Sequence, residues 1–325
     1  MTLKAYIIIL TAHNVVNLKE IKIMKKIVLA TALAVSALAA SAQVTVSGRI
    51  APFVDSTKTG STTVNSLVND SSKIVLKAEE RLNSVMSARV VVDTTVAVDD
   101  PKAGSATQLG DRQATVGLAS KVASIDLGRK EHSQYLAVKA ADPFGGATYA
   151  SVSPDVINDR SRRIGDAVFV GANVGPVTAS YDRSFYTNPA TVEATSWSLG
   201  GKVGPVAAAV ARFETGPDYT NIVTLSGQVA GVTLSTVQSE DKTGAVETKG
   251  QLYGVSIPVA KTPVTLRGSY GIKTGLVAGD VKAYNVGVNY AFSKRTSMLL
   301  AVRDVNAGGT ANDVRQYGVG LVHSF

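Results

Sequence analysis

Few side chains in this chain of 325 residues are suited to catalysis. The sequence contains no cysteine and three histidines, of which His13 lies in the N-terminal leader described below. His132 follows Glu131, and His323 lies near the C-terminus, but neighbours in sequence form an acid–base pair only if the fold orients them. The sequence shows no metal-ligand spacing and no serine-containing elbow. We therefore expect no cofactor, no metal and no enzymatic activity.

Charged side chains could instead act on passing solutes. The segment 131–160 is much longer than a hairpin requires, and such loops are usually functional or disordered. It contains Asp142, Asp155 and Asp159. Acidic and basic groups that face each other across water produce a field that orients polar solutes, and an excess of one sign biases the passage of ions. Three basic residues fall on the polar faces of alternating segments: Arg49, Lys77 and Arg89.

The elements that position these groups have the alternation of half-buried strands. Between Ala283 and Phe292, tyrosine, valine and phenylalanine occupy one face, and alanine, asparagine and glycine occupy the other. The same period of two recurs in 86–93, 177–182, 264–270 and 317–325. Val206–Ala211 and Ala167–Ala172 are ambiguous; they could lie at a subunit interface, although uneven alternation is the commoner cause.

Two kinds of turn separate the strands. Seven short ones, near 81–83, 120–121, 173–176, 202–205, 230–231, 260–263 and 293–295, have the composition of tight hairpins. Eight longer polar ones lie near 56–71, 96–111, 131–160, 186–193, 215–219, 241–248, 273–279 and 306–312. Fifteen connections predict about sixteen strands, with both termini at the end that has the short turns.

The N-terminus has the three parts of a secretory signal. Lys25 and Lys26 precede an apolar stretch from Ile27 to Leu38, and Ala40-Ser41-Ala42 forms a small-residue cleavage site. We expect translation to begin at Met24, with 1–23 an over-extended start, 24–42 the signal peptide and cleavage between Ala42 and Gln43. N-terminal sequencing of the mature protein tests this expectation.

Half of the chain's net charge of +8 belongs to this leader. Residues 43–325 retain +4, with 28 basic and 24 acidic side chains. This modest charge removes the main support for a nucleic-acid partner.

Lipid and water are the two environments that the alternation predicts. A soluble β-sandwich would need bulky core residues on its inner faces, whereas the faces opposite the apolar ones hold Thr, Ser, Asn, Gly, Arg and Asp. A water-filled lumen explains such faces more simply. An exported chain with these strands predicts an all-β fold, a transmembrane antiparallel β-barrel of about 16 strands spanning residues 43–325.

The mature chain resembles the general porins of Gram-negative outer membranes, especially the trimeric type of β-proteobacteria. The order of several short stretches carries the resemblance: Val44–Ile50, Ser71–Glu80, Asp111–Leu118, Ile125–Arg129, Ala141–Gly146, Tyr290–Ser297 and Gly320–Phe325. The sequence departs from the family pattern at Val322, where an arginine is usual, and at Ser47-Gly48, where a tyrosine is usual. These departures affect channel size and selectivity more than the fold.

The resemblance implies that 131–160 is a third loop that folds into the barrel and narrows it. Its tip would be Asp142, Pro143, Phe144, Gly145 and Gly146, with Asp142 on the acidic side of the constriction and Asp155 or Asp159 beside it. Lys73, Arg129 and Arg163 match wall positions of the family. Alternation turns Arg129 outward, so a lumen position requires a β-bulge or the end of the strand. Phe325 matches the terminal aromatic that serves as an assembly signal.

A channel for passive diffusion of ions and small hydrophilic solutes is therefore the predicted function, with outer-membrane lipid as its surroundings and a homotrimer as its assembly. The charge of +4 predicts a mild preference for anions. The alternatives are a barrel with a plugged lumen that serves as a surface adhesin or structural protein and, less favoured, an outer-membrane hydrolase.

Overall fold

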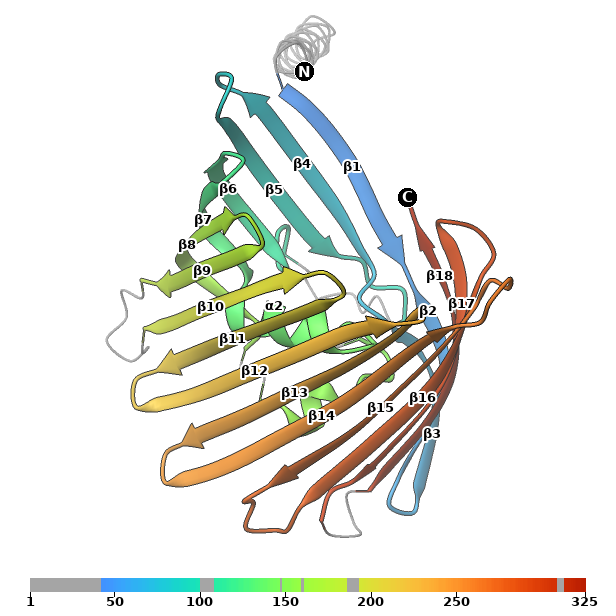
Figure 1. Ribbon diagram of the computed structural model, residues 1–325. Coiled ribbons are helices and arrows are strands. Elements are labelled where there is room, and N and C mark those ends of the chain that lie inside the picture. Colours follow the sequence, from blue (N-terminus) through green and yellow to red (C-terminus); the bar gives the residue numbers. More distant parts are fainter. Residues whose placement is uncertain (1–41, 100–107, 147, 159–160, 186–192, 309–312) are drawn as a thin grey trace, which may run out of the picture.

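The protein is an antiparallel β-barrel whose strands surround two short helices (Figure 1). The computed structural model describes all residues except 1–41, 100–107, 147, 159–160, 186–192 and 309–312. In chain order the strands are β1 (Ala42–Ile50), β2 (Pro52–Thr59), β3 (Thr62–Asn69), β4 (Lys73–Arg81), β5 (Ser87–Thr95), β6 (Gln113–Ala119), β7 (Ala123–Glu131), β8 (Arg163–Val174), β9 (Val177–Ser184), β10 (Ala194–Val203), β11 (Val206–Thr215), β12 (Asp218–Val229), β13 (Val232–Thr243), β14 (Val246–Pro258), β15 (Val264–Thr274), β16 (Val281–Ala291), β17 (Thr296–Asn306) and β18 (Val314–Ser324). The helices α2 (Ser133–Ala141) and α3 (Ser153–Val156) both lie between β7 and β8.

These labelled strands form sixteen barrel strands. β1 and β2 are two halves of the first, because β1 pairs with β4 and β2 pairs with β3. β3 and β4 are likewise two halves of the second. β18 pairs with both β1 and β2 and so closes the sheet. The predicted number of strands is confirmed, and the start of β1 and the end of β18 both lie at the end with the short turns (Figure 1).

The two faces of the strands differ as the alternation predicts. In β16, Tyr284, Val286 and Val288 are exposed, while Asn285 and Gly287 between them are buried. A closed barrel pairs the backbone groups of every strand with its neighbours, so an apolar outer face can contact lipid without unsatisfied polar groups. No helix among the described residues is long and apolar enough to cross a membrane.

Three of the predicted long loops are tight turns instead. β2 and β3 continue to Thr59 and Thr62 and are joined at Gly60-Ser61, where Gly60 has a φ of 56°. Residues 216–217 and 244–245 are also two-residue connections, with Gly216 and Gly244 at positive φ. Gly at a left-handed position lets the strands run on to the turn. Polar composition alone does not separate a loop from the polar tip of a long strand.

The ambiguous alternation of Val206–Ala211 has a packing explanation inside the barrel. β11 is one of the strands on which α2 lies, and Ala211 packs in one cluster with Val138 and Ala141 of α2. Small side chains leave room for the helix. In β8, Ala167 and Phe169 are buried, while Val170 is 43% exposed. Both segments are regular barrel strands in their antiparallel ladders.

The C-terminal residue closes the barrel against the first strand. The N–H of Phe325 donates to the carbonyl of Gly48 over 3.1 Å, and the Gly48 N–H donates back over 3.0 Å. A Cβ on Gly48 would lie 2.4 Å from the Phe325 ring. The glycine at this place therefore accommodates the terminal aromatic ring.

Candidate pore constriction

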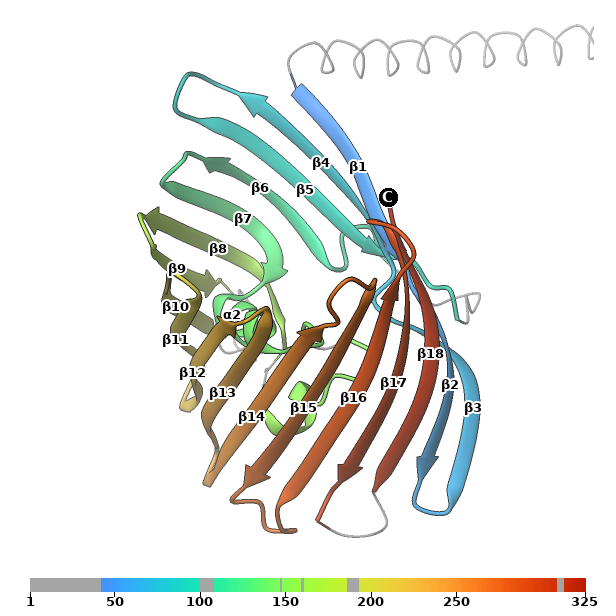
Figure 2. The same ribbon diagram turned by 45° about the vertical axis from the view of Figure 1, so that its right-hand side comes forward.

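The described residues of the segment 132–162 lie inside the barrel, as Figure 2 shows for its two helices; we call them the inward loop. α2 contacts strands β9–β13 and α3 contacts β14–β16, so the two helices pack on one half of the wall. His132 caps the N-terminus of α2, and its ring Nδ1 accepts a hydrogen bond from the N–H of Tyr135 over 3.3 Å. The His132 ring is fully buried and packs on Phe213 of β11, with ring centroids 4.5 Å apart. This histidine therefore acts as a helix cap and core residue.

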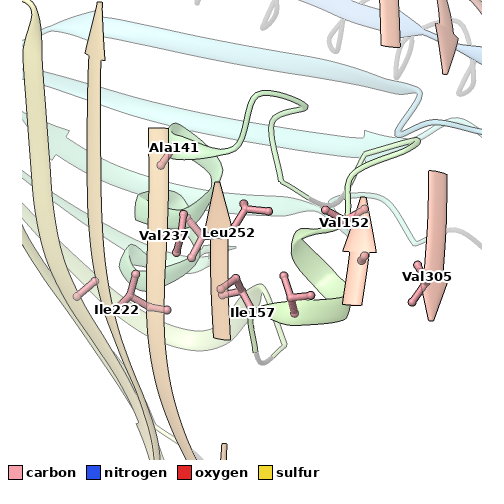
Figure 3. Close-up of a cluster of buried hydrophobic side chains, with 11 residues drawn as sticks. Ala141, Val152, Ile157, Ile222, Val237, Leu252 and Val305 are labelled. Atoms are coloured by element: carbon pink, nitrogen blue, oxygen red, sulfur yellow. The ribbon is translucent and has the colours of Figure 1, made fainter. Parts of the chain in front are cut away.

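Apolar packing joins the loop to the wall beneath it. Val138, Val152, Val156 and Ile157 of the loop are almost fully buried. Figure 3 shows the cluster that they form with residues of the facing strands, among them Ile222, Val237, Leu252 and Val305. Apolar residues on the inner face of these strands thus pack against the loop and hold it on the wall.

Inward-facing glycines make room for a second cluster around Phe144 and Tyr149. The Tyr149 ring stacks on Phe53 of β2, with centroids 4.2 Å apart. A Cβ on Gly318 of β18 would lie 1.9 Å from the Tyr149 hydroxyl, and one on Gly287 of β16 would lie 2.9 Å from the Phe144 ring. The inner face of β18 is small at Gly318 and at Gly320, where an added Cβ would lie 2.4 Å from the Phe53 ring. Its space is occupied by aromatic rings of the loop and of the first strand.

Acidic side chains of the wall hold the backbone of the loop. Asp182 accepts from the N–H of Ser133 over 2.6 Å, and Asp70 accepts from the N–H of Tyr149 over 2.8 Å. The Tyr149 hydroxyl donates to Asp55. These three carboxylates, with Asp241 where Asn158 docks, are at most 7% exposed. Hydrogen bonds to charged acceptors are the stronger ones in proteins, so these acids fix the loop in place.

Asp142 lies within the loop and is only 6% exposed. Its carboxylate accepts from the N–H groups of Phe144 and Gly146, over 2.9 and 3.1 Å, and from the hydroxyl of Ser151 over 2.6 Å. Burial raises the pKa of Asp142, against the opposing effect of these hydrogen bonds and of the charge of Arg267. The carboxylate shapes the turn through Gly145 and Gly146, both at a φ of 81°. The structure therefore does not place it on the open side of the loop.

The remaining residues of the predicted tip also face the wall or the loop itself. Pro143 lies against β14, because a Cβ on Gly254 would be 2.4 Å from its ring. Asp155 forms a two-oxygen ion pair with Arg303 of β17, at 2.6 and 2.7 Å. Asp159 lies outside the described residues.

The side of the loop that does not pack on the wall, which we call its open side, carries Leu136 and Lys139 and faces a basic cavity. A space of about 340 Å³ separates α2 from strands β4–β8. Seven basic side chains line it, against three acidic ones, Asp93, Asp126 and Glu131. Glu79 lies beyond its edge, 2.6 Å from Lys77. The basic residues of this cavity are Lys73, Lys77, Arg89, Arg112, Lys130, Lys139 and Arg163.

Ion pairs fix most of these bases along the wall. Arg89 contacts Asp126 through two hydrogen bonds of 2.8 Å, and Lys130 contacts the same carboxylate over 2.5 Å. Lys73 and Arg112 share Asp93, at 3.0 and 3.2 Å. Arg163 and Lys139 share Glu131, at 3.0 and 2.9 Å. Each of these three acids is thus bound to two bases, which leaves an excess of positive charge around the opening.

Two of the bases predicted from the sequence lie elsewhere. Arg49 pairs with Asp70 at 2.6 Å, so it supports the carboxylate that anchors Tyr149. Arg129 is exposed and donates to the carbonyl of Asp111 over 3.0 Å. The expected bulge occurs, but its extra residue is in β8, where Asp166 has a φ of 48°. Alternation therefore continues through β7, and Lys130 lines the cavity in place of Arg129.

Sequence reasoning missed Arg112, Lys130, Lys139, Arg267 and Arg303. Lys130 could have been found by strict alternation from Asp126. Arg267 was already on the polar face of its strand. The sequence gives no signal for the pairing of Arg303 with Asp155, because 148 residues separate them.

Fold and site together define a class of protein. The barrel is closed and apolar outside, and inside it a folded loop lies beside a row of charges. This is the structure of an outer-membrane diffusion channel. A model of the Gram-negative porin family matches residues 29–325. This chain belongs to that family. It forms a channel in the outer membrane.

Solved structures share the fold at low sequence identity. The anion-selective porin from Comamonas acidovorans is 18% identical, with a TM-score of 0.73 over 87% of this chain and 100% of that one. Salmonella typhi OmpF, solved in complex with daunomycin, is 15% identical, with a TM-score of 0.71 over 87% and 97%. The trimer form of OmpT from Vibrio cholerae is 10% identical, with a TM-score of 0.69 over 88% and 100%. No curated protein sequence matches this chain significantly.

Proposed function

We propose that the inward loop is the constriction of the pore and that the pore prefers anions to cations. The observation that carries the proposal is the basic cavity, in which seven basic side chains face three acidic ones beside the open side of α2. Charged rings at a constriction attract ions of the opposite sign and repel the others. Small hydrophilic solutes pass through the same opening.

Acids and bases are buried to different degrees, which explains how a chain with nearly equal numbers of the two can still select anions. Asp55, Asp70, Asp182 and Asp241 are buried against the loop, and Asp142 is buried within it. Bases of the opposite wall remain in contact with the open cavity. The field in the opening therefore depends on where the charges lie more than on the net charge of the whole chain.

Charge reversal on the loop tests the proposal. Lys139 faces the cavity and its side chain is 41% exposed, so Lys139→Glu changes the local charge by two without emptying a packed site. Replacing a positive by a negative charge beside the opening should lower the anion-to-cation permeability ratio at least about fivefold at low salt. The ratio is measured from reversal potentials in a salt gradient across a planar bilayer.

Lys249→Glu is the matched control. Lys249 lies in β14, its side chain is 72% exposed, and it does not line the basic cavity. This variant changes the net charge equally but should leave the permeability ratio almost unchanged. Equal effects of the two variants, or no effect of Lys139→Glu, would reject the basic cavity as the selectivity site.

We also propose that three copies assemble into a homotrimer. The support is the fold shared with OmpT of Vibrio cholerae, which was solved in a trimer form. The molar mass of the detergent-solubilised protein, measured before and after heat denaturation, tests this. A single mass equal to one chain under both conditions would reject the trimer.

A catalytic role has little support from the site. His132 is buried as the cap of α2, and His323 contacts the hydroxyl of Thr296 over 2.9 Å at the end of β18. Neither lies in the basic cavity. We propose that the protein passes solutes without transforming them, and that the mature chain begins at Gln43 after removal of the leader. Residues 1–41 lie outside the described part of the chain.

A further inference from the structure

We propose that the pore favours organic anions that carry a short apolar group over hydroxylated anions of the same charge and carbon number. This inference rests on the proposed anion preference and names the class of solute that it serves. The observation behind it is an apolar surface on α2 that begins beside the basic cavity and continues into a second space of the lumen.

Leu136 is the residue where the two spaces meet. Its side chain is 44% exposed, and it is the only large apolar side chain with such exposure among the described residues of the inward loop. The packing of α2 on the wall uses Val138 and Ala141, so Leu136 is not needed to hold the helix. It lines the basic cavity together with Lys139 and also lines the second space.

The second space, which we call the alanine-lined cavity, has a volume of about 410 Å³ and lies between α2 and strands β9–β12. Small apolar residues form much of its lining, with Ala137 and Ala140 on the helix and Ala207 and Ala209 on β11. Serine and threonine hydroxyls make up much of the remainder. Lys202 is its one charged lining residue within the described part of the chain, and it is basic.

An anion with a hydrocarbon group can use both spaces at once. Its carboxylate is attracted by Lys139 and Lys130, while its apolar end covers Leu136 and the adjacent alanines and displaces water from them. Removing apolar surface from water is favourable, and the gain grows with the area covered. A hydroxylated anion would place hydroxyl groups on this apolar part of the lining, where they lose water without gaining a hydrogen bond from the side chains of Leu136 and the alanines. An inorganic anion gains only the electrostatic attraction.

Hexanoate and gluconate are suitable probes, because each carries one carboxylate and six carbons. Each sodium salt is placed opposite sodium chloride across a planar bilayer containing the purified channel, at a pH where both carboxylates are ionised. Reversal potentials give the permeability of each anion relative to chloride, and bulk conductivities correct for mobility. We expect the corrected ratio of hexanoate to gluconate to be about fourfold, the effect of removing one methylene group from water.

Variants at Leu136 separate this effect from selectivity by charge. Leu136→Ser should bring the corrected ratio near one, whereas the channel should still prefer chloride to sodium, because all seven bases of the cavity are retained. Leu136→Met keeps an apolar side chain and should keep the wild-type ratio. Ala140→Asn, at a second exposed position of α2, provides an independent polar change that should also lower the ratio.

The outcomes are distinguishable. If the wild-type channel prefers chloride to sodium but passes hexanoate and gluconate at their bulk mobility ratio, the inference is wrong and the proposed function stands. If Leu136→Ser keeps the wild-type ratio, the alanine-lined cavity is not its cause and the inference is again wrong. If the wild-type channel prefers sodium, the proposed anion preference fails, and this inference fails with it.

Discussion

Substitution of Gly318 tests how the inward loop is held, because the glycine forms the socket for Tyr149. A Cβ at this position would lie 1.9 Å from the Tyr149 hydroxyl oxygen and 2.4 Å from the adjoining ring carbon. Contacts this short require the ring to move. Gly318→Ala should therefore displace Tyr149 from its contact with the wall.

The interactions lost with Tyr149 set the size of the effect. Its hydroxyl donates to the buried Asp55, and its ring stacks on Phe53 with centroids 4.2 Å apart. A hydrogen bond to a charged group contributes about 1.5–3 kcal/mol and an aromatic pair about 0.5–1.5 kcal/mol. A loss of about 2–4 kcal/mol raises the population of the detached loop at least about thirtyfold.

Single-channel recording and limited proteolysis measure this population. Detachment should increase current fluctuations and expose the inward loop to cleavage, while the barrel remains resistant. Gly268→Ala is the matched control, since its added Cβ meets no atom closer than 3.5 Å. In a Tyr149→Ala background, Gly318→Ala should have little further effect, because the clashing ring is gone. If Gly318→Ala shows the current fluctuations and protease resistance of the wild type, Gly318 does not form the socket that holds Tyr149.

Three further predictions concern acidity, charge and closure. Burial raises the pKa of Asp142 and of Asp155, the latter despite the attraction of Arg303. Both carboxylates therefore bind protons more tightly when the loop is folded than when it is unfolded. The stability of the folded loop should thus rise as the pH falls from 7 through the raised pKa values towards about 3.9, the ordinary pKa of an aspartate. Fewer current fluctuations at acidic pH would agree, and more would contradict it. Asp93→Asn, which neutralises one acid of the basic cavity, should raise the anion-to-cation permeability ratio about twofold, and a lowered ratio would count against the site. Phe325→Ala removes the ring at the barrel seam and should reduce the yield of heat-resistant folded barrel in outer-membrane fractions; an unchanged yield would show that the ring is dispensable.

Local patterns of the sequence were sufficient to predict the barrel. Each strand carries its own alternation, and each turn its own composition, so the sixteen strands and the position of both termini follow without knowledge of distant contacts. The tight turns at 60–61, 216–217 and 244–245 were missed, because the outer ends of long strands are as polar as the loops.

The site could be predicted only in part, because it depends on pairings between distant residues. The loop and several of its charges are visible in the sequence, and Lys73, Arg89 and Arg163 do line one cavity. The sequence does not show that Asp142 turns inward to bind Phe144 and Gly146. Which acids are used to hold the loop, and which remain in the open lumen, is decided by the three-dimensional packing.

The reversal potential of the wild-type channel tests the central claim most directly. The claim is that the acids of the pore are largely used to fix the inward loop, while the bases line the opening. Purified protein in a neutral planar bilayer, with a gradient of potassium chloride at neutral pH, should give a potential of the sign set by chloride. The magnitude should fall as the salt concentration rises on both sides at a constant ratio, because the charges are screened. A potential of the sign set by potassium would contradict the claim.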